Sequence, residues 1–154
     1  MTSSYQDQLD VLIGQRVLHG ERFSYVRITH DVKILVRPVY LEEQSLPFED
    51  HFVWAYQIRA ENLRQDPVQL MSRYWRITDA SGRVIEVRGS GVVGEQPIIQ
   101  PGSHFEYTSG TPLAAPSGIM VGCFEMKDLL SGESFDVDVP AFSLDSPFQK
   151  ISLN

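Results

Sequence analysis

The chain of 154 residues has the length of one globular domain with at most a short appendage. Hydrophobic residues make up 42% of it and charged residues 21%, as in proteins that bury a core, so extensive disorder is excluded. The formal net charge is −7, and the sequence contains no basic run. This charge argues against partners that are nucleic acids or anionic membranes.

Residues 1–31 are interpreted as an N-terminal extension. Ser4 and Asp7 have the spacing of a capping box and Gly14 can end a helix, so a short helix is expected here. Residues 15–32 show no clear period and predict a linker, with a short strand near residues 23–28. Residues 1–10 lack the features of a secretory signal, and no apolar stretch approaches the ~20 residues that cross a bilayer. Together with the single cysteine, Cys123, these features predict a cytoplasmic protein without membrane insertion.

From residue 33 onward the pattern has period two, with turn residues between the runs. In the second run, Phe52, Trp54, Tyr56 and Ile58 are expected on one face. The absence of helical crossovers implies antiparallel pairing. The prediction is an all-β fold, an immunoglobulin-like or fibronectin-III-like sandwich of about seven strands, with a Greek-key barrel as the alternative. The domain is expected to span residues 32–148, followed by a tail at 149–154. The predicted strands are 33–40, 52–62, 68–78, 83–88, 103–109, 118–128 and 134–144.

A glycine-rich segment follows the fourth of these strands. It consists of Gly89, Ser90, Gly91, Val92, Val93 and Gly94, which satisfies the G-x-G-x-x-G pattern of dinucleotide-binding turns. Such a turn must open a helix, but Pro97 and Pro101 lie where that helix would run, so dinucleotide binding is not expected. Two interpretations stay open. In the structural one, the glycines let a long loop fold back while Val92 and Val93 anchor it. In the functional one, successive amides form a nest for a phosphate-containing ligand, assisted by Arg88 and Arg73.

A recognition surface for a protein partner is expected on the strands beside this loop. Its candidate residues are Tyr74, Trp75, Arg76 and Tyr107, because exposed aromatic and Arg side chains dominate protein contacts. The four histidines are too scattered for a zinc site, although Asp136 and Asp138 share a strand face. We find no nucleophile with a recognisable partner, so neither a catalytic residue, a metal site nor a cofactor is predicted.

Several motifs in order make residues 32–148 resemble the ApaG family. They are the run 68–83 leading into the glycine segment, then Phe105-Glu106-Tyr107-Thr108-Ser109-Gly110, and then the segment 118–126. The resemblance implies a fibronectin-III-like sandwich. It also implies a link to cobalt resistance and magnesium efflux, and related domains occur in F-box proteins and in a DNA-polymerase-delta-interacting protein, where they serve protein contacts. Tyr74 stands where many relatives have His, so a metal role does not carry over to that position.

The leading hypothesis is therefore a non-enzymatic binding or regulatory module, linked to Co²⁺ and Mg²⁺ homeostasis, that acts on a protein partner not identified by the sequence. A protein that binds phosphate, pyrophosphate or a dinucleoside polyphosphate through the glycine segment is the alternative. A hydrolase ranks third, and whether the chain forms homo-oligomers stays open.

Overall fold

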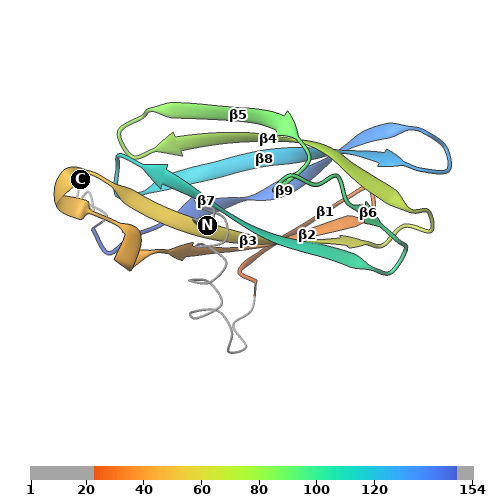
Figure 1. Ribbon diagram of the computed structural model, residues 1–154, viewed down its shortest axis with the longest axis horizontal. Coiled ribbons are helices and arrows are strands. Elements are labelled where there is room, and N and C mark those ends of the chain that lie inside the picture. The colour runs from red at the N-terminus through yellow and green to blue at the C-terminus, as the bar shows by residue number, and fades with distance from the viewer. Residues whose placement is uncertain (1–22, 149–154) are drawn as a thin grey trace, which may run out of the picture.

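The computed structural model describes residues 23–148, and Figure 1 shows two antiparallel sheets packed face to face. One sheet has the order β1-β2-β3-β7 and the other β5-β4-β8-β9, with the short β6 paired to β4. The expected all-β sandwich is confirmed. Among residues 23–148, no helix is long and apolar enough to cross a membrane. The elements are β1 (Tyr25–Thr29), β2 (Val32–Tyr40), η1 (Glu42–Gln44), η2 (Pro47–Glu49), β3 (Phe52–Asn62), β4 (Val68–Asp79), β5 (Val84–Ser90), β6 (Ile98–Ile99), β7 (His104–Leu113), β8 (Gly118–Asp128) and β9 (Ser134–Leu144).

The strand boundaries agree closely with the sequence prediction. The strands β3, β8 and β9 begin and end where expected, whereas β7 continues past residue 109 to Leu113. The short strand expected near residues 23–28 is β1, and it pairs with β2 along its whole length. The sandwich therefore begins at Tyr25, inside the segment that the sequence assigned to an extension. The predicted N-terminal helix and the tail at 149–154 lie outside the described residues.

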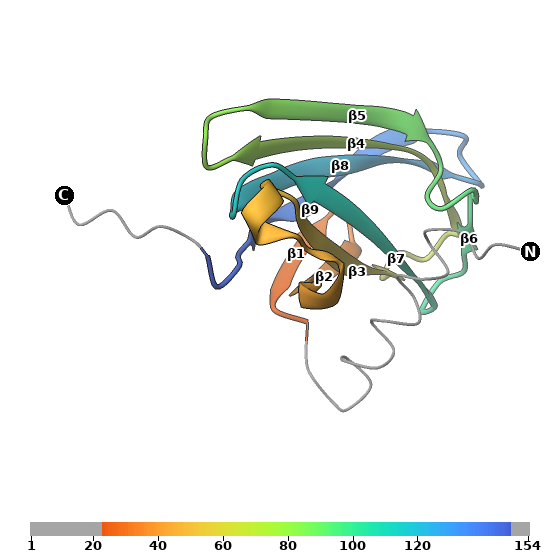
Figure 2. The same cartoon turned by 60° about the vertical axis from the view of Figure 1, so that its left-hand side comes forward.

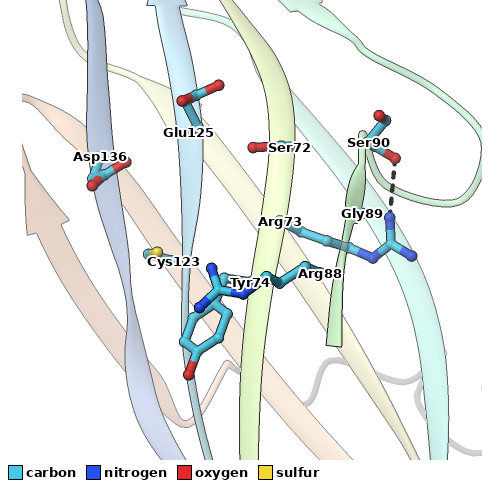
Figure 3. Close-up of a pocket in the computed structure, with 9 residues that line it drawn as sticks. All are labelled: Ser72, Arg73, Tyr74, Arg88, Gly89, Ser90, Cys123, Glu125 and Asp136. Atoms are coloured by element: carbon cyan, nitrogen blue, oxygen red, sulfur yellow. Dashed lines mark hydrogen bonds between the residues drawn. The ribbon is translucent and has the colours of Figure 1, made fainter. Parts of the chain in front are cut away.

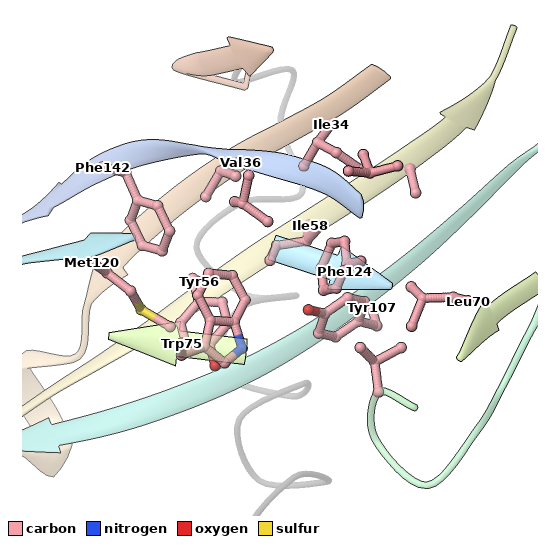
Figure 4. Close-up of a cluster of buried hydrophobic side chains, with 14 of the residues drawn as sticks. Ile34, Val36, Tyr56, Ile58, Leu70, Trp75, Tyr107, Met120, Phe124 and Phe142 are labelled. Carbon is pink, nitrogen blue, oxygen red and sulfur yellow. The ribbon is translucent and has the colours of Figure 1, made fainter. Parts of the chain in front are cut away.

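The core lies between the two sheets and is rich in aromatic rings (Figure 4). Phe52, Trp54, Tyr56 and Ile58 are all buried on the inner face of β3, as the alternation predicts. From the opposite sheet, the Trp75 ring meets Phe124 and Phe142 edge-on, with ring centroids 5.9 and 6.2 Å apart. Such contacts add roughly 0.5–1.5 kcal/mol per pair to the burial of the rings themselves. The Tyr56 ring of β3 crosses to the same cluster, with centroids 5.6 Å from Trp75 and 5.9 Å from Phe142, so aromatic packing joins the two sheets.

The two sides of the sandwich differ. On one side β9 packs along β1 and β2, where Arg27 and Asp138 form an ion pair with an N···O distance of 2.8 Å. The backbone amide of Asp138 also donates to Thr29 Oγ1 at 3.2 Å, and that of Ser143 donates to the Tyr25 hydroxyl at 3.3 Å. On the other side β5 and β7 stay apart, and the chain leaving β5 turns toward β6 there (Figure 2). The sandwich is thus closed at β1 and β9 and open between β5 and β7.

The turn between β8 and β9 is organised by the Asp128 carboxylate. It accepts hydrogen bonds from the amides of Leu130 and Ser131 at 2.9 and 3.0 Å and from Arg64 Nη2 at 3.2 Å. The Ser131 amide is the largest cause that lowers the pKa of Asp128 from 3.8 to about 2. The neighbouring Asp66 has a raised pKa, mainly because its side chain hydrogen-bonds with Asp128. The ionised form of Asp128 is therefore the one that the fold favours.

In the Asp128→Asn variant, the free energy of unfolding is expected to depend less on pH in the acid range. A depressed folded-state pKa contributes stability above pH 3.8, and this contribution is lost as the pH falls from 3.8 towards 2. The raised pKa of Asp66 acts in the opposite direction, because it favours folding at low pH. It therefore offsets part of the pH dependence that Asp128 causes. Urea denaturation between pH 2 and 6 measures the profile, with Glu133→Gln in the same turn as the control. Equal changes in both variants would contradict the assignment to Asp128.

Candidate functional site

The outer face of the β5-β4-β8-β9 sheet carries a hollow that crosses all four strands. It is a shallow groove of about 490 Å³ (Figure 3). Strand alternation explains its lining, because inward residues such as Phe124 and Val137 leave their neighbours on the outside. Its lining residues are Ser72, Arg73 and Tyr74 from β4, Arg88, Gly89 and Ser90 from β5, Cys123 and Glu125 from β8, and Asp136 from β9. We refer to this hollow as the outer-face groove.

Arg88 and Tyr74 stack on each other in the outer-face groove. The Arg88 Cζ lies 4.2 Å from the centroid of the Tyr74 ring, which is a cation–π contact worth about 0.5–1 kcal/mol at an exposed site. Glu125 and Asp136 line the same groove, so both signs of charge meet on this face. An ordered guanidinium beside an aromatic ring and two carboxylates offers directional hydrogen bonds to a polar partner.

A second hollow of about 330 Å³ continues the first across β8 and β9. The two share Tyr74 and Cys123, and the second adds Arg76, Arg27 and Asp138 among its lining residues. The expectation that Asp136 and Asp138 share a face is confirmed, since both border these hollows. The Arg27–Asp138 pair is exposed enough to contribute at most about 1 kcal/mol.

Cys123 lies where the two hollows meet but is not activated. Desolvation raises the pKa of its thiol, and the carboxylates of Asp136 and Asp138 raise it further, while Arg88 acts in the opposite direction. The thiolate is the nucleophilic form of cysteine, and an elevated pKa keeps its population low at neutral pH. These surroundings therefore disfavour nucleophilic chemistry at Cys123.

The glycine segment folds back on the sheet, as the structural interpretation expected. Gly89 and Ser90 belong to β5, and the Gly91 amide donates to the Met71 carbonyl at 2.8 Å. The Val92 amide donates to the Glu95 carbonyl at 2.8 Å, and the Val92 side chain is fully buried. The chain then runs to β6, where a dinucleotide-binding turn would continue as a helix. Val93 is 41% exposed and does not anchor the loop, so the prediction was right for Val92 and wrong for Val93.

The two arginines predicted to assist an anion in this loop point in different directions (Figure 3). Arg88 stacks on Tyr74 in the outer-face groove. Arg73 passes beneath Gly89, and its Nη1 donates to the carbonyl oxygens of Ser90 and Gly91, both at 3.0 Å. A shared clamp on a ligand in the loop is therefore not formed, because Arg73 holds the loop and Arg88 belongs to the sheet face.

The predicted recognition surface needs one further correction. Trp75 is 2% exposed and Tyr107 is 9% exposed, so both rings lie in the core and neither can face a partner. Tyr74 and Arg76 lie on the outer face, as the prediction requires. Ser72, Cys123 and Glu125 also line the groove beside Tyr74, and none of them was predicted there. The signal for Cys123 and Glu125 was their alternation with Phe124 along β8.

Comparisons with known proteins agree with this architecture. Residues 42–128 match the family model described as the ApaG domain. The chain is 58% identical over 130 residues to Protein ApaG of Parvibaculum lavamentivorans and 57% identical over 130 residues to Protein ApaG of Paramagnetospirillum magneticum. Both alignments cover 84% of this chain and 99% of the relative. A crystal structure described as an ApaA protein from Bordetella pertussis is 43% identical, with a TM-score of 0.74 over 79% of this chain and 98% of that one. The chain therefore belongs to the ApaG family.

Proposed function

We propose that the protein is a non-enzymatic binding module that recognises a protein partner through the outer-face groove. The observation that carries the proposal is the Arg88–Tyr74 stack, set beside Glu125 and Asp136 on an open sheet face. Tyr and Arg are the residue types most often found at energetic centres of protein interfaces. The stack also restricts the Arg88 side chain before binding, which reduces the entropy lost when a partner immobilises it.

The link to divalent-cation homeostasis rests on the family resemblance. In this proposal the module acts on cation balance through its partner, and its own surface supplies recognition. Cys123 supports a binding role, since its raised pKa disfavours the nucleophilic thiolate. The alternative, a phosphate-containing ligand cradled by residues 89–94, has weaker support, because the amides of Gly91 and Val92 already donate within the protein.

Affinity capture with the full chain as bait tests this proposal. The wild type is expected to retain a specific protein, and Tyr74→Ala combined with Arg88→Ala is expected to weaken that complex by at least about tenfold. The matched control is Arg59→Ala on the other sheet, where Arg59 Nη1 lies 2.9 Å from a carboxylate oxygen of Glu106. Captures are run with and without added Mg²⁺ and Co²⁺.

Two outcomes would count against the proposal. Failure to retain any specific partner under all cation conditions would remove the recognition role. Equal losses in the double variant and in Arg59→Ala would show that the outer-face groove is not the contact surface. If the retained partner is a second copy of the chain, size-exclusion chromatography of the double variant should show a shift to monomer.

A further inference from the structure

A cavity of about 180 Å³ lies at the open side of the sandwich, where β4, β7 and the chain after β5 meet. Arg73 borders both this cavity and the outer-face groove, but the other walls differ, because here they include the inward-facing Tyr56, Trp75 and Tyr107. We call it the inter-sheet cavity. Its lining residues are Tyr56, Arg73, Trp75, Val92, Val93, Gly94, Tyr107 and Ser109.

Tyr107 lines this cavity, and its buried hydroxyl has no hydrogen-bond partner among residues 23–148. In Figure 4 its oxygen lies on the side of the ring that faces Tyr56 and Trp75. Leaving a buried hydroxyl unpaired costs roughly 1–3 kcal/mol, so such groups are normally satisfied by a neighbour, a water or a ligand. The Tyr56 hydroxyl, in contrast, is paired with the Ser109 side chain. Burial raises the pKa of both tyrosines, so both remain O–H donors at neutral pH.

Arg73 brings a positive charge to the same cavity, whose described lining residues include no carboxylate. Its Nη1 donates to the Ser90 and Gly91 carbonyls, and within residues 23–148 it takes part in no ion pair. A guanidinium has five N–H donors, so Nη2 and Nε retain capacity after these two bonds. The positive charge of Arg73 acts on the hydroxyls of both Tyr56 and Tyr107, because it lowers their pKa values while burial raises them. A half-buried cation next to an unpaired O–H donor is complementary to a small anion.

We propose that the inter-sheet cavity binds a small oxyanion of the size of inorganic phosphate, with the Tyr107 hydroxyl donating to it and Arg73 balancing its charge. The volume limits the ligand, because pockets for drug-sized molecules span roughly 300–1,000 Å³. A nucleotide base and ribose do not fit, although the terminal phosphate of a larger ligand could enter from the open side. This site uses side chains between the sheets, so it is separate from a nest formed by the amides of residues 89–94. It also goes beyond the proposed partner recognition on the outer face.

Titration calorimetry of the full chain with inorganic phosphate, in a phosphate-free chloride buffer, tests the proposal. One saturable site is expected in the wild type. Tyr107→Phe removes only the oxygen and should weaken binding about tenfold to a hundredfold, as expected for a lost hydrogen bond to a charged group. The matched control is Tyr40→Phe, because the Tyr40 hydroxyl is also buried without a partner in the described part of the chain, while its ring packs against Trp54, outside the cavity lining. It should bind phosphate as the wild type does.

Two further measurements locate the bound ion and show whether it is free phosphate or part of a larger ligand. Amide chemical shifts should change around Tyr107 and Ser109 on addition of phosphate. Parallel titrations with pyrophosphate and diadenosine tetraphosphate show whether a free ion or the end of a larger ligand is preferred, and Tyr107→Phe should weaken whichever binds. Three results would overturn the proposal: no saturable phosphate binding at millimolar concentration, equal affinities in the wild type and Tyr107→Phe, or equal losses in Tyr107→Phe and Tyr40→Phe. None of them bears on Tyr74 and Arg88, so the capture experiment can fail or succeed separately.

Discussion

Gly122→Val is expected to lower the free energy of unfolding by about 3 kcal/mol or more. Gly122 lies opposite Trp75 in the β4–β8 pairing, on the core side of β8. A Cβ at this position would overlap the Tyr74 carbonyl oxygen and the Trp75 ring. Phe124 and Phe142 pack against this ring edge-on and restrict its movement within the core. The substitution must therefore separate β4 from β8 or displace Trp75 from the core.

Urea denaturation followed by tryptophan fluorescence measures this effect. The matched control is Cys123→Ala, the next residue of β8, which points to the outer face and should cost no more than about 1 kcal/mol. If Gly122→Val fails to fold, Gly122→Ala gives a graded version, because the overlap begins at the Cβ itself. A Gly122→Val variant as stable as Cys123→Ala would show that Trp75 does not occupy the space over Gly122.

Gly91→Ala is expected to cost about 2–3 kcal/mol, since it combines backbone strain with a clash. Gly91 has φ of +59°, and an added Cβ would overlap the backbone carbonyl of Glu95. That carbonyl accepts the hydrogen bond of the Val92 amide, so moving it loosens the buried Val92 as well. The substitution therefore tests whether the G-x-G-x-x-G pattern is explained by the way the loop folds back.

The neighbouring glycine of the same motif provides the control for Gly91→Ala. Gly94 has φ of +80°, but an added Cβ there meets nothing within 4 Å. Gly94→Ala should therefore show the strain alone, about 1 kcal/mol. Thermal and urea denaturation of both variants separate the two contributions. Equal costs would mean that the close approach of residues 91 and 95 contributes nothing to stability.

Most of the fold could be predicted from the sequence, because period-two alternation and turn residues are local signals. The run from Phe52 to Asn62 shows this, since its inward residues and its ends were both correct. The inward and outward faces of β4, in contrast, do not follow from alternation. Leu70 and Trp75 both face the core although strict alternation would place them on opposite faces. A register shift between Leu70 and Ser72 changes the alternation, and such a bulge leaves no clear mark in the sequence.

Less of the site could be predicted. The sequence identified Tyr74, Arg76, Arg88 and Arg73, but not which of them share a face. The outer-face groove joins side chains from four strands, and their pairing depends on register. The inter-sheet cavity is harder still, because Tyr56 and Tyr107 come from separate strands of one sheet and Arg73 from the other. A hydroxyl without a partner can be found only when all neighbours are in place.

The closed side of the sandwich also constrains the order of events while the chain is being made. Thr29 and Asp138, which hydrogen-bond across that side, are 109 positions apart. At ~5–20 residues per second, a ribosome needs about 5–20 s to add the residues between them. During this interval β1 can pair with β2 but has no β9 beside it, so one flank of the core is open to water. Chains that stop before β9 would keep that flank open permanently, which makes them substrates for chaperones and proteases.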